Sequence, residues 1–172
     1  MEKQIDFYFD IVSPYSYIAS MLIEDVAHRV NAKVIWKPFL LGGVFNAVGT
    51  KDPPGVHPTK KPYLVKDLQR ISRYLKIPIK FPPDFPVRTV LAMRTLCGLG
   101  ADQIPHAAHT LYQAYWVNNQ DIADPDVMAS LIGKDSVNNA GNQEIKDKLF
   151  QFTDEAVQRG AFGAPTFFVE DE

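Results

Sequence analysis

The first forty residues carry two kinds of hydrophobic pattern. Residues 4–10 alternate, with Ile5, Phe7 and Phe9 on one side and polar residues on the other, which predicts a β-strand. After Ser13-Pro14 a hydrophobic side chain recurs every four residues and predicts one helix, through Ile18, Leu22, Val26 and Val30. Residues 32–41 are rich in Val, Ile, Trp and Phe and predict a second strand. The chain is therefore expected to open as a β-α-β unit.

The middle of the chain has mostly helical patterns. Residues 42–62 are rich in glycine and proline and predict a long irregular connection around one short helical turn. Five further helices are predicted, at residues 61–77, 87–99, 106–117, 124–132 and 144–157. A β-like pattern returns only at Thr166 to Val169. We expect a single α/β domain over residues 1–172, with a helical insertion at about residues 60–140 before the last strand.

Composition and charge exclude several classes of protein. Hydrophobic residues make up 46% and charged residues 22% of the 172 residues, as in ordinary globular domains. The net charge of -2 gives no broad attraction to phosphate backbones, so we expect no nucleic-acid partner. The chain has no stretch long enough to span a bilayer and no secretion signal at its start, so we expect a cytoplasmic protein without a membrane partner.

Cysteine and histidine positions limit the chemistry further. Cys97 is the single cysteine, which excludes an internal disulfide and a dithiol redox pair, and its apolar helical surroundings are typical of a small buried side chain. His106 and His109 are one helical turn apart, but no acidic or cysteine ligand accompanies them, so we expect no metal site. Any sulfur chemistry must therefore use the sulfur of a ligand.

Two proline-containing turns lie near opposite ends of the chain. Ser13-Pro14 stands between the first predicted strand and helix, where serine is a favoured helix cap and proline a favoured first helical residue. Ala164-Pro165 directly precedes the last predicted strand, where a proline commonly opens an edge strand. Each turn has a purely structural explanation when it is taken alone.

Together the two turns resemble those of a known family, and so do segments between them. The similar segments are residues 6–10, 13–16, 40–45, 67–70, 77–78, 115–116, 121–122 and 160–166. They resemble the thioredoxin-like branch that contains 2-hydroxychromene-2-carboxylate isomerases and kappa-class glutathione transferases, which are related to periplasmic disulfide oxidoreductases. The redox members carry Cys-Pro-X-Cys at the first turn, whereas this chain carries Ser13 and Ser16. The resemblance implies a thioredoxin-like α/β fold with a helical insertion, a cis peptide before Pro165, and glutathione as cofactor.

The resemblance also implies roles for individual residues. It assigns glutathione contacts to Ser13, Pro14, Tyr15, Ala164 and Pro165, and to Thr50 near the place where relatives often carry an asparagine. Serine is a weak acid and no histidine is near it in the sequence to act as its base, so we expect Ser13 to donate a hydrogen bond to the glutathione thiolate rather than to attack. The helix start is expected to add N–H groups and partial positive charge. Ala164 would pair its backbone with the cysteinyl part of glutathione.

A small aromatic substrate would need an apolar pocket with a few polar anchors. Candidate walls are Tyr15, Phe39, Phe45 and Trp116, and candidate anchors for anionic groups are Lys51, Lys60 and Lys61. Each has a simpler alternative, because large aromatic residues are common in the core and lysines in loops are commonly solvated.

The sequence leads to a glutathione-dependent isomerase of 2-hydroxychromene-2-carboxylate, or of a similar intermediate of aromatic catabolism, acting by reversible thiolate addition. The alternatives are a kappa-class-like glutathione transferase and a non-catalytic module that binds thiols or peptides. A disulfide oxidoreductase is disfavoured, because two serines cannot cycle between dithiol and disulfide. Relatives continue beyond the position of Glu172 through another strand and a final helix, which we expect this chain to lack, and a homodimer is left open.

Overall fold

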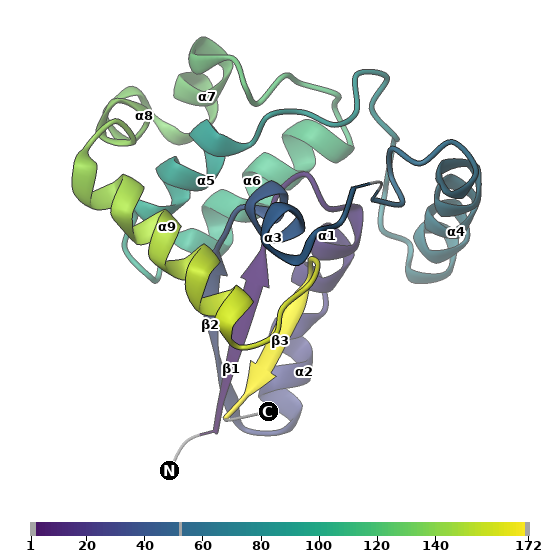
Figure 1. Ribbon diagram of the computed structural model, residues 1–172, viewed down its shortest axis with the longest axis horizontal. Helices are drawn as coiled ribbons and strands as arrows, with labels where there is room; N and C mark the ends of the chain where they lie inside the picture. The colour runs from purple at the N-terminus through teal and green to yellow at the C-terminus, as the bar shows by residue number, and fades with distance from the viewer. Residues whose placement is uncertain (1–2, 52, 171–172) are drawn as a thin grey trace.

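The computed structural model describes residues 3–51 and 53–170, and a three-stranded sheet lies at the centre of this part of the chain (Figure 1). β1 (Lys3–Phe9) pairs in parallel with β2 (Ala32–Pro38) and antiparallel with β3 (Thr166–Val169). The strand order is β2-β1-β3. The first and last described strands therefore lie side by side, which is the thioredoxin-like layout expected from the sequence.

The segment between β1 and β2 forms two helices, so the prediction of one continuous helix is wrong. α1 (Pro14–Ser20) ends before Met21, and α2 (Ile23–Arg29) begins a new helical segment. The break changes which side chains face inward: Ile23 and Ala27 are buried on α2. Beyond the break, the residues of the expected hydrophobic stripe are exposed instead: the exposed fraction is 38% for Leu22, 38% for Val26 and 53% for Val30.

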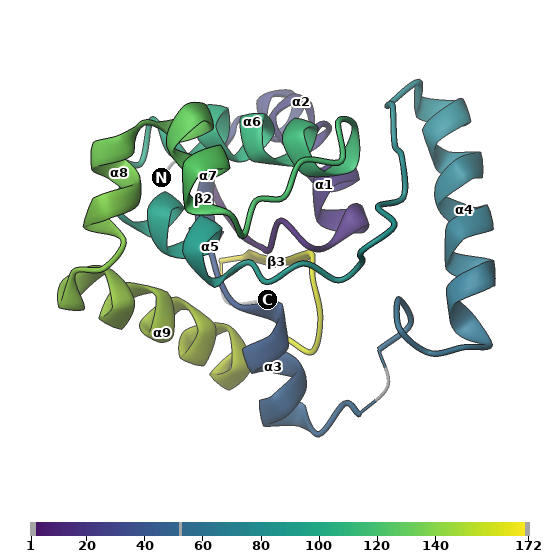
Figure 2. The ribbon, with the colours of Figure 1, turned by 90° about the horizontal axis from the view of Figure 1, so that it is seen from above.

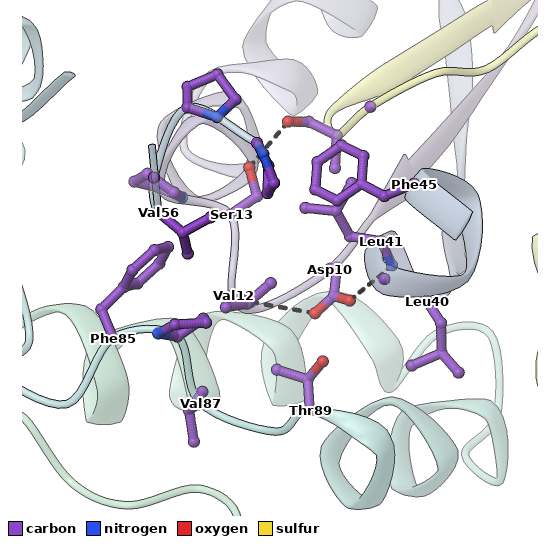
Figure 3. A pocket seen from close by; sticks show the side chains of 18 of the residues that line it. Asp10, Val12, Ser13, Leu40, Leu41, Phe45, Val56, Phe85, Val87 and Thr89 are labelled. Atoms are coloured by element: carbon purple, nitrogen blue, oxygen red, sulfur yellow. Dashed lines mark hydrogen bonds between the residues drawn. The ribbon is translucent and has the colours of Figure 1, made fainter. Parts of the chain in front are cut away.

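The connection after β2 contains more helix than the sequence pattern indicates. α3 (Leu41–Val48) starts at the last residue of the predicted strand over residues 32–41, and it continues through the first seven residues of the expected irregular connection. Gly49 ends α3 in the left-handed conformation, with φ of 74°, where a glycine meets no steric penalty. α3 brings Leu41 and Phe45 beside the turn that follows β1 (Figure 3).

The remaining helices follow the predicted order closely. Their bounds are α4 (Lys60–Leu75), α5 (Val90–Cys97), α6 (Ile104–Trp116), α7 (Pro125–Ile132), α8 (Lys134–Asn139) and α9 (Gln143–Gln158). The short helix α8 was not predicted, because six residues are too few to display a helical period. Within the described residues, no helix combines the length and the hydropathy that a bilayer crossing demands.

Hydrophobic side chains are buried on both faces of the sheet. Figure 2 shows α1, α2 and α6 on one side of the sheet and α3 and α9 on the other. Phe7 and Phe9 of β1 pack into the larger core cluster, with Tyr17 and Tyr112 of the helices. Tyr8 belongs to a smaller cluster that includes Phe39, Val44, Ala156 and Ala161. Because both faces of β1 are covered, its polar residues are buried as well and need partners.

Asp6 on the second face is paired with two cations. Its Oδ2 atom lies 2.6 Å from Nη1 of Arg159 and 3.1 Å from Nζ of Lys37. Lys37 also lies 2.8 Å from Oε1 of Glu155. Burial opposes ionisation of Asp6, but hydrogen bonds from Arg159, Gln4 and Lys37 outweigh it, so the pKa of Asp6 lies below its ordinary value. The network joins β1 and β2 to α9.

We expect Asp6→Asn to lower the free energy of unfolding by about 2 kcal/mol near neutral pH, because Lys37 and Arg159 lose the negative charge between them. A carboxyl whose pKa is lowered by folding stabilises the protein above its unfolded pKa, here 3.8, and loses this contribution as the pH falls below that value. Urea unfolding at several pH values measures the effect. A difference between wild type and variant that persists undiminished well below pH 3.8 would show that the charge of Asp6 is not its cause.

Candidate active site

Ser13 occupies the turn between β1 and α1 and caps the helix. Its Oγ atom accepts a hydrogen bond from the backbone N–H of Ser16 at 3.1 Å, and Pro14 is the first residue of α1. The serine has extended backbone angles and is 4% exposed. The capping role considered from the sequence is therefore real. α1 spans only seven residues, and one of its first N–H groups is already paired with Ser13. We therefore consider the Ser13 hydroxyl, rather than the N–H groups of the helix, as the main polar group of this turn.

The same hydroxyl also reaches the turn before β3. Ser13 Oγ donates a hydrogen bond to the backbone oxygen of Ala164 at 2.9 Å, although 151 positions separate the two residues (Figure 3). The peptide bond between Ala164 and Pro165 is cis. The structure thus brings together the two proline-containing turns that the sequence singled out.

A cavity of about 640 Å³ opens beside these two turns. Its walls come from Asp10 and residues 12–15, residues 40–43 and Phe45, residues 53–56, Leu64, residues 85–90 and residues 162–164. The lining side chains are mostly apolar, and the polar ones among them are those of Asp10, Ser13, Tyr15, Arg88 and Thr89. A volume of this size is typical of sites for small molecules.

Asp10 is a buried carboxyl at the base of this cavity. Its Oδ1 atom accepts a hydrogen bond from the N–H of Val12 at 3.1 Å, and its Oδ2 atom accepts one from the N–H of Leu41 at 2.9 Å. Thr89 points toward the carboxyl from below (Figure 3). Burial raises the pKa of Asp10, and these N–H groups and the side chain of Thr89 offset only part of that effect. Asp10 thereby ties the Ser13 turn to the start of α3.

Tyr15 and Gly55 shape the side of the cavity next to α4. The Tyr15 hydroxyl donates a hydrogen bond to Oδ2 of Asp67 at 2.7 Å, which links α1 to α4. Burial and the neighbouring carboxylate of Asp67 raise the pKa of Tyr15, so its hydroxyl stays protonated. Gly55 lies so close to Phe85 that a β-carbon at this position would stand 2.6 Å from the ring. The loop before α4 can therefore pack directly on an aromatic wall.

Only some of the residues predicted to contact the substrate line the cavity. Phe45 and Tyr15 line the cavity, as expected from the sequence. Phe39 and Trp116 do not: both have zero exposure and belong to the core. Trp116 packs behind Phe85 and donates its Nε1 hydrogen to the backbone oxygen of Ile11 at 2.8 Å. The sequence interpretation of these two rings as pocket walls is corrected accordingly.

The predicted anchors and the Thr50 contact lie outside the cavity lining. Thr50 and Lys51 follow α3, and Thr50 donates its N–H to the backbone oxygen of Phe45 at 2.8 Å. Lys60 is exposed, and Nζ of Lys61 lies 5.5 Å from the centre of the Phe81 ring. None of these residues is part of the cavity wall, and their contacts with a ligand stay a prediction.

Most of the lining residues were not predicted as site residues from the sequence, and four of them have large or charged side chains that shape the cavity. They are Asp10, Phe85, Arg88 and Phe162. Phe162 is 78% exposed, and its position just before Gly163-Ala164-Pro165 was a usable signal. An acidic residue directly after the apolar end of β1 was a similar signal for Asp10. Phe85 and Arg88 follow a proline-rich stretch whose path the sequence pattern does not define.

Comparisons with known proteins agree with the fold. The family model of the DSBA-like thioredoxin domain matches residues 4–172. The 2-hydroxychromene-2-carboxylate isomerase of Sphingobium xenophagum is 30% identical over 183 residues, which cover 100% of this chain and 91% of the relative. Glutathione S-transferase kappa 1 of Homo sapiens is 27% identical over 182 residues, which cover 96% of this chain and 80% of the relative.

A solved structure gives the same architecture. A 2-hydroxychromene-2-carboxylate isomerase superposes with a TM-score of 0.85, at 24% sequence identity, over 98% of this chain and 86% of its own. At this level of identity the likeness shows the fold. At the level of sequence, the chain is similar to glutathione-related isomerases and transferases.

Proposed function

This chain belongs to the DsbA-like thioredoxin domain family, and from that premise we propose that it is a glutathione-dependent isomerase acting on 2-hydroxychromene-2-carboxylate or a similar intermediate of aromatic catabolism. The observation that carries the proposal is the pairing of the Ser13 hydroxyl with the Ala164 carbonyl on the wall of an apolar cavity. The isomerase relative from Sphingobium xenophagum supports the choice of reaction.

The chain's own sulfur is unsuited to the chemistry. Cys97 is buried, and desolvation raises the pKa of its thiol to about 12. The two positions that hold redox cysteines in relatives are Ser13 and Ser16. A thiolate nucleophile is therefore supplied from outside, which is consistent with the glutathione named in the kappa-class relatives.

The residues at the cavity fit such a thiol. A hydroxyl is a suitable donor to a sulfur anion, and the Ala164 carbonyl accepts hydrogen bonds from a peptide N–H laid alongside it. Bound glutathione would be held by Ser13 and the Ala164 backbone, and it would supply a thiolate nucleophile for reversible addition to the unsaturated substrate. Ser13 holds the sulfur in place, and the apolar walls, Phe45 and Phe85 among them, exclude water and contact the aromatic substrate.

The proposal is tested by mixing the protein with glutathione and 2-hydroxychromene-2-carboxylate and following the ultraviolet spectrum. Glutathione-dependent isomerisation with no consumption of glutathione is expected. Absence of turnover, with glutathione bound, would reject this substrate.

A kappa-like transferase is the second candidate, and one observation favours it. The cavity lining is mostly apolar, and Arg88 is the one basic side chain among the described lining residues, so the cavity would accommodate uncharged aromatic electrophiles. Formation of a stable conjugate with an electrophilic aromatic compound, accompanied by loss of free glutathione, would support the transferase.

Ser13→Ala is expected to reduce the thiolate fraction of bound glutathione at neutral pH by about tenfold, because a hydrogen bond to a charged group contributes roughly 1.5–3 kcal/mol. The ultraviolet absorbance of the thiolate measures this fraction. The variant also loses a helix cap, so Asp124→Ala serves as the matched control: Asp124 caps α7 by accepting the N–H of Asp126 at 2.8 Å, away from the cavity lining. An unchanged thiolate signal in Ser13→Ala would remove Ser13 from this role.

A further inference from the structure

The single donor hydrogen of the Ser13 hydroxyl is already used within the protein. A serine hydroxyl has one hydrogen to donate and two lone pairs to accept hydrogen bonds. The hydrogen is donated to the Ala164 oxygen at 2.9 Å, and one lone pair accepts the Ser16 N–H at 3.1 Å. Ser13 is 4% exposed, so water has little access to it. A new hydrogen bond from this hydroxyl therefore requires an existing one to be broken.

Stabilising a thiolate requires that same hydrogen. If the hydroxyl turns toward a sulfur anion, the Ala164 carbonyl loses its donor. Ala164 is half-buried and lines the cavity, so a ligand that fills the cavity and excludes water leaves this acceptor unpaired, which offsets part of the gain from a new hydrogen bond. A thiol that presents only its sulfur would therefore gain little from Ser13.

A peptide-like thiol resolves this conflict. An amide N–H on the carbon next to the CH₂–SH group can donate to the Ala164 oxygen while the sulfur faces Ser13. Ser13 Oγ lies 2.9 Å from the Ala164 oxygen and both residues line the cavity, so one ligand segment could reach both. The ligand's N–H then replaces the serine as the donor to Ala164.

We infer that the Ala164 carbonyl is a specificity-determining group, which releases the Ser13 hydroxyl to the sulfur only when the ligand's own amide N–H takes its place. The inference rests on the proposed function and adds to it which thiols the site activates. Thiols with an acylated amino group beside the CH₂–SH group are activated, and simple thiols are not. Backbone recognition and activation of the sulfur are thereby coupled in one exchange of hydrogen bonds.

The test compares glutathione with its depsipeptide analogue, in which an ester oxygen replaces the cysteinyl N–H and nothing else changes. Thiolate absorbance as a function of pH gives the pKa of each bound thiol relative to the free compound. In wild type we expect the thiolate fraction at neutral pH to be about tenfold higher for glutathione than for the analogue. In Ser13→Ala, where no hydroxyl is exchanged, the two ligands should differ by less than twofold.

Three outcomes would overturn the exchange. Equal thiolate fractions for both ligands in wild type would mean that the amide does not release Ser13. An equally large difference in wild type and Ser13→Ala would mean that the amide acts without the serine. Failure of the analogue to bind wild type at all would assign the amide to binding alone. Failure of glutathione itself to bind would instead reject the proposed function, so the two failures are distinguishable.

Discussion

Replacing Trp116 by alanine is expected to lower the free energy of unfolding by about 4 kcal/mol, as is typical when a fully buried large aromatic side chain is removed. Trp116 has zero exposure, and its ring centre lies 5.8 Å from that of Phe81 and 6.0 Å from that of Phe85. Its Nε1 hydrogen bonds to the backbone oxygen of Ile11, two residues before Ser13. The substitution therefore leaves a cavity behind one pocket wall and an unpaired carbonyl beside the Ser13 turn.

Urea unfolding measures this loss, and a thermal midpoint about 10 °C lower is expected for a chain of this size. Trp116→Phe is the matched control, because it keeps most of the packing and removes the N–H donor; it should cost about half as much. If Trp116→Ala kept wild-type stability and lost only substrate binding, the ring would be a pocket wall, as the sequence first suggested, and its placement in the core would be wrong.

The case of Trp116 shows what the sequence pattern does not contain. The pattern identifies large hydrophobic residues, but both a core and an apolar pocket are built from them. Phe39 and Phe45 are six positions apart, yet one is fully buried and the other lines the cavity. Phe39 precedes α3 and packs with Tyr8 and Ala156, whereas Phe45 lies on α3. The orientation of α3 is set by its contacts with α9, more than a hundred residues away along the chain.

The positions of the strands and most helices were predictable because their periods are strong and local. The alternation in β1 predicted its two faces correctly, and the strand from Thr166 to Val169 matches its predicted bounds. The break between α1 and α2 was not predictable, because no proline or glycine occurs between Ser20 and Ile23. Only tertiary packing distinguishes the buried Ile23 from the half-exposed Leu22.

The two turns of the candidate site were predictable together and not separately. Ser13-Pro14 and Ala164-Pro165 each have an ordinary structural role, and the resemblance of the whole chain to a family was needed to expect them to be neighbours. The hydrogen bond between Ser13 and Ala164 follows from the sheet order, since β3 lies against β1. Its consequence for a bound thiol depends on the direction of one hydroxyl, which no sequence pattern encodes.

Asp10→Ala is expected to lower the free energy of unfolding by about 3 kcal/mol and to weaken glutathione binding at least tenfold. The carboxyl is 1% exposed, and without it the N–H groups of Val12 and Leu41 lose their acceptors. Val12 directly precedes Ser13, and Leu41 is the first residue of α3, which carries Phe45. The substitution therefore removes the group that holds both of these cavity walls. We expect it to change both the stability of the fold and the geometry of the site.

Urea unfolding and glutathione titration measure the two effects, and two further variants separate their causes. Asp10→Asn keeps the volume, but its amide has one acceptor oxygen and turns an NH₂ group toward the other backbone N–H, so we expect it to be nearly as damaging as alanine. Asp154→Ala removes an exposed aspartate of α9 that accepts a hydrogen bond from Gln158, and it should change stability by less than about 0.5 kcal/mol. If Asp10→Asn retained both stability and affinity, Asp10 would serve to fill space and the paired acceptors would not be needed. If both Asp10 variants were unstable yet bound glutathione normally once folded, the carboxyl would support the fold without shaping the site.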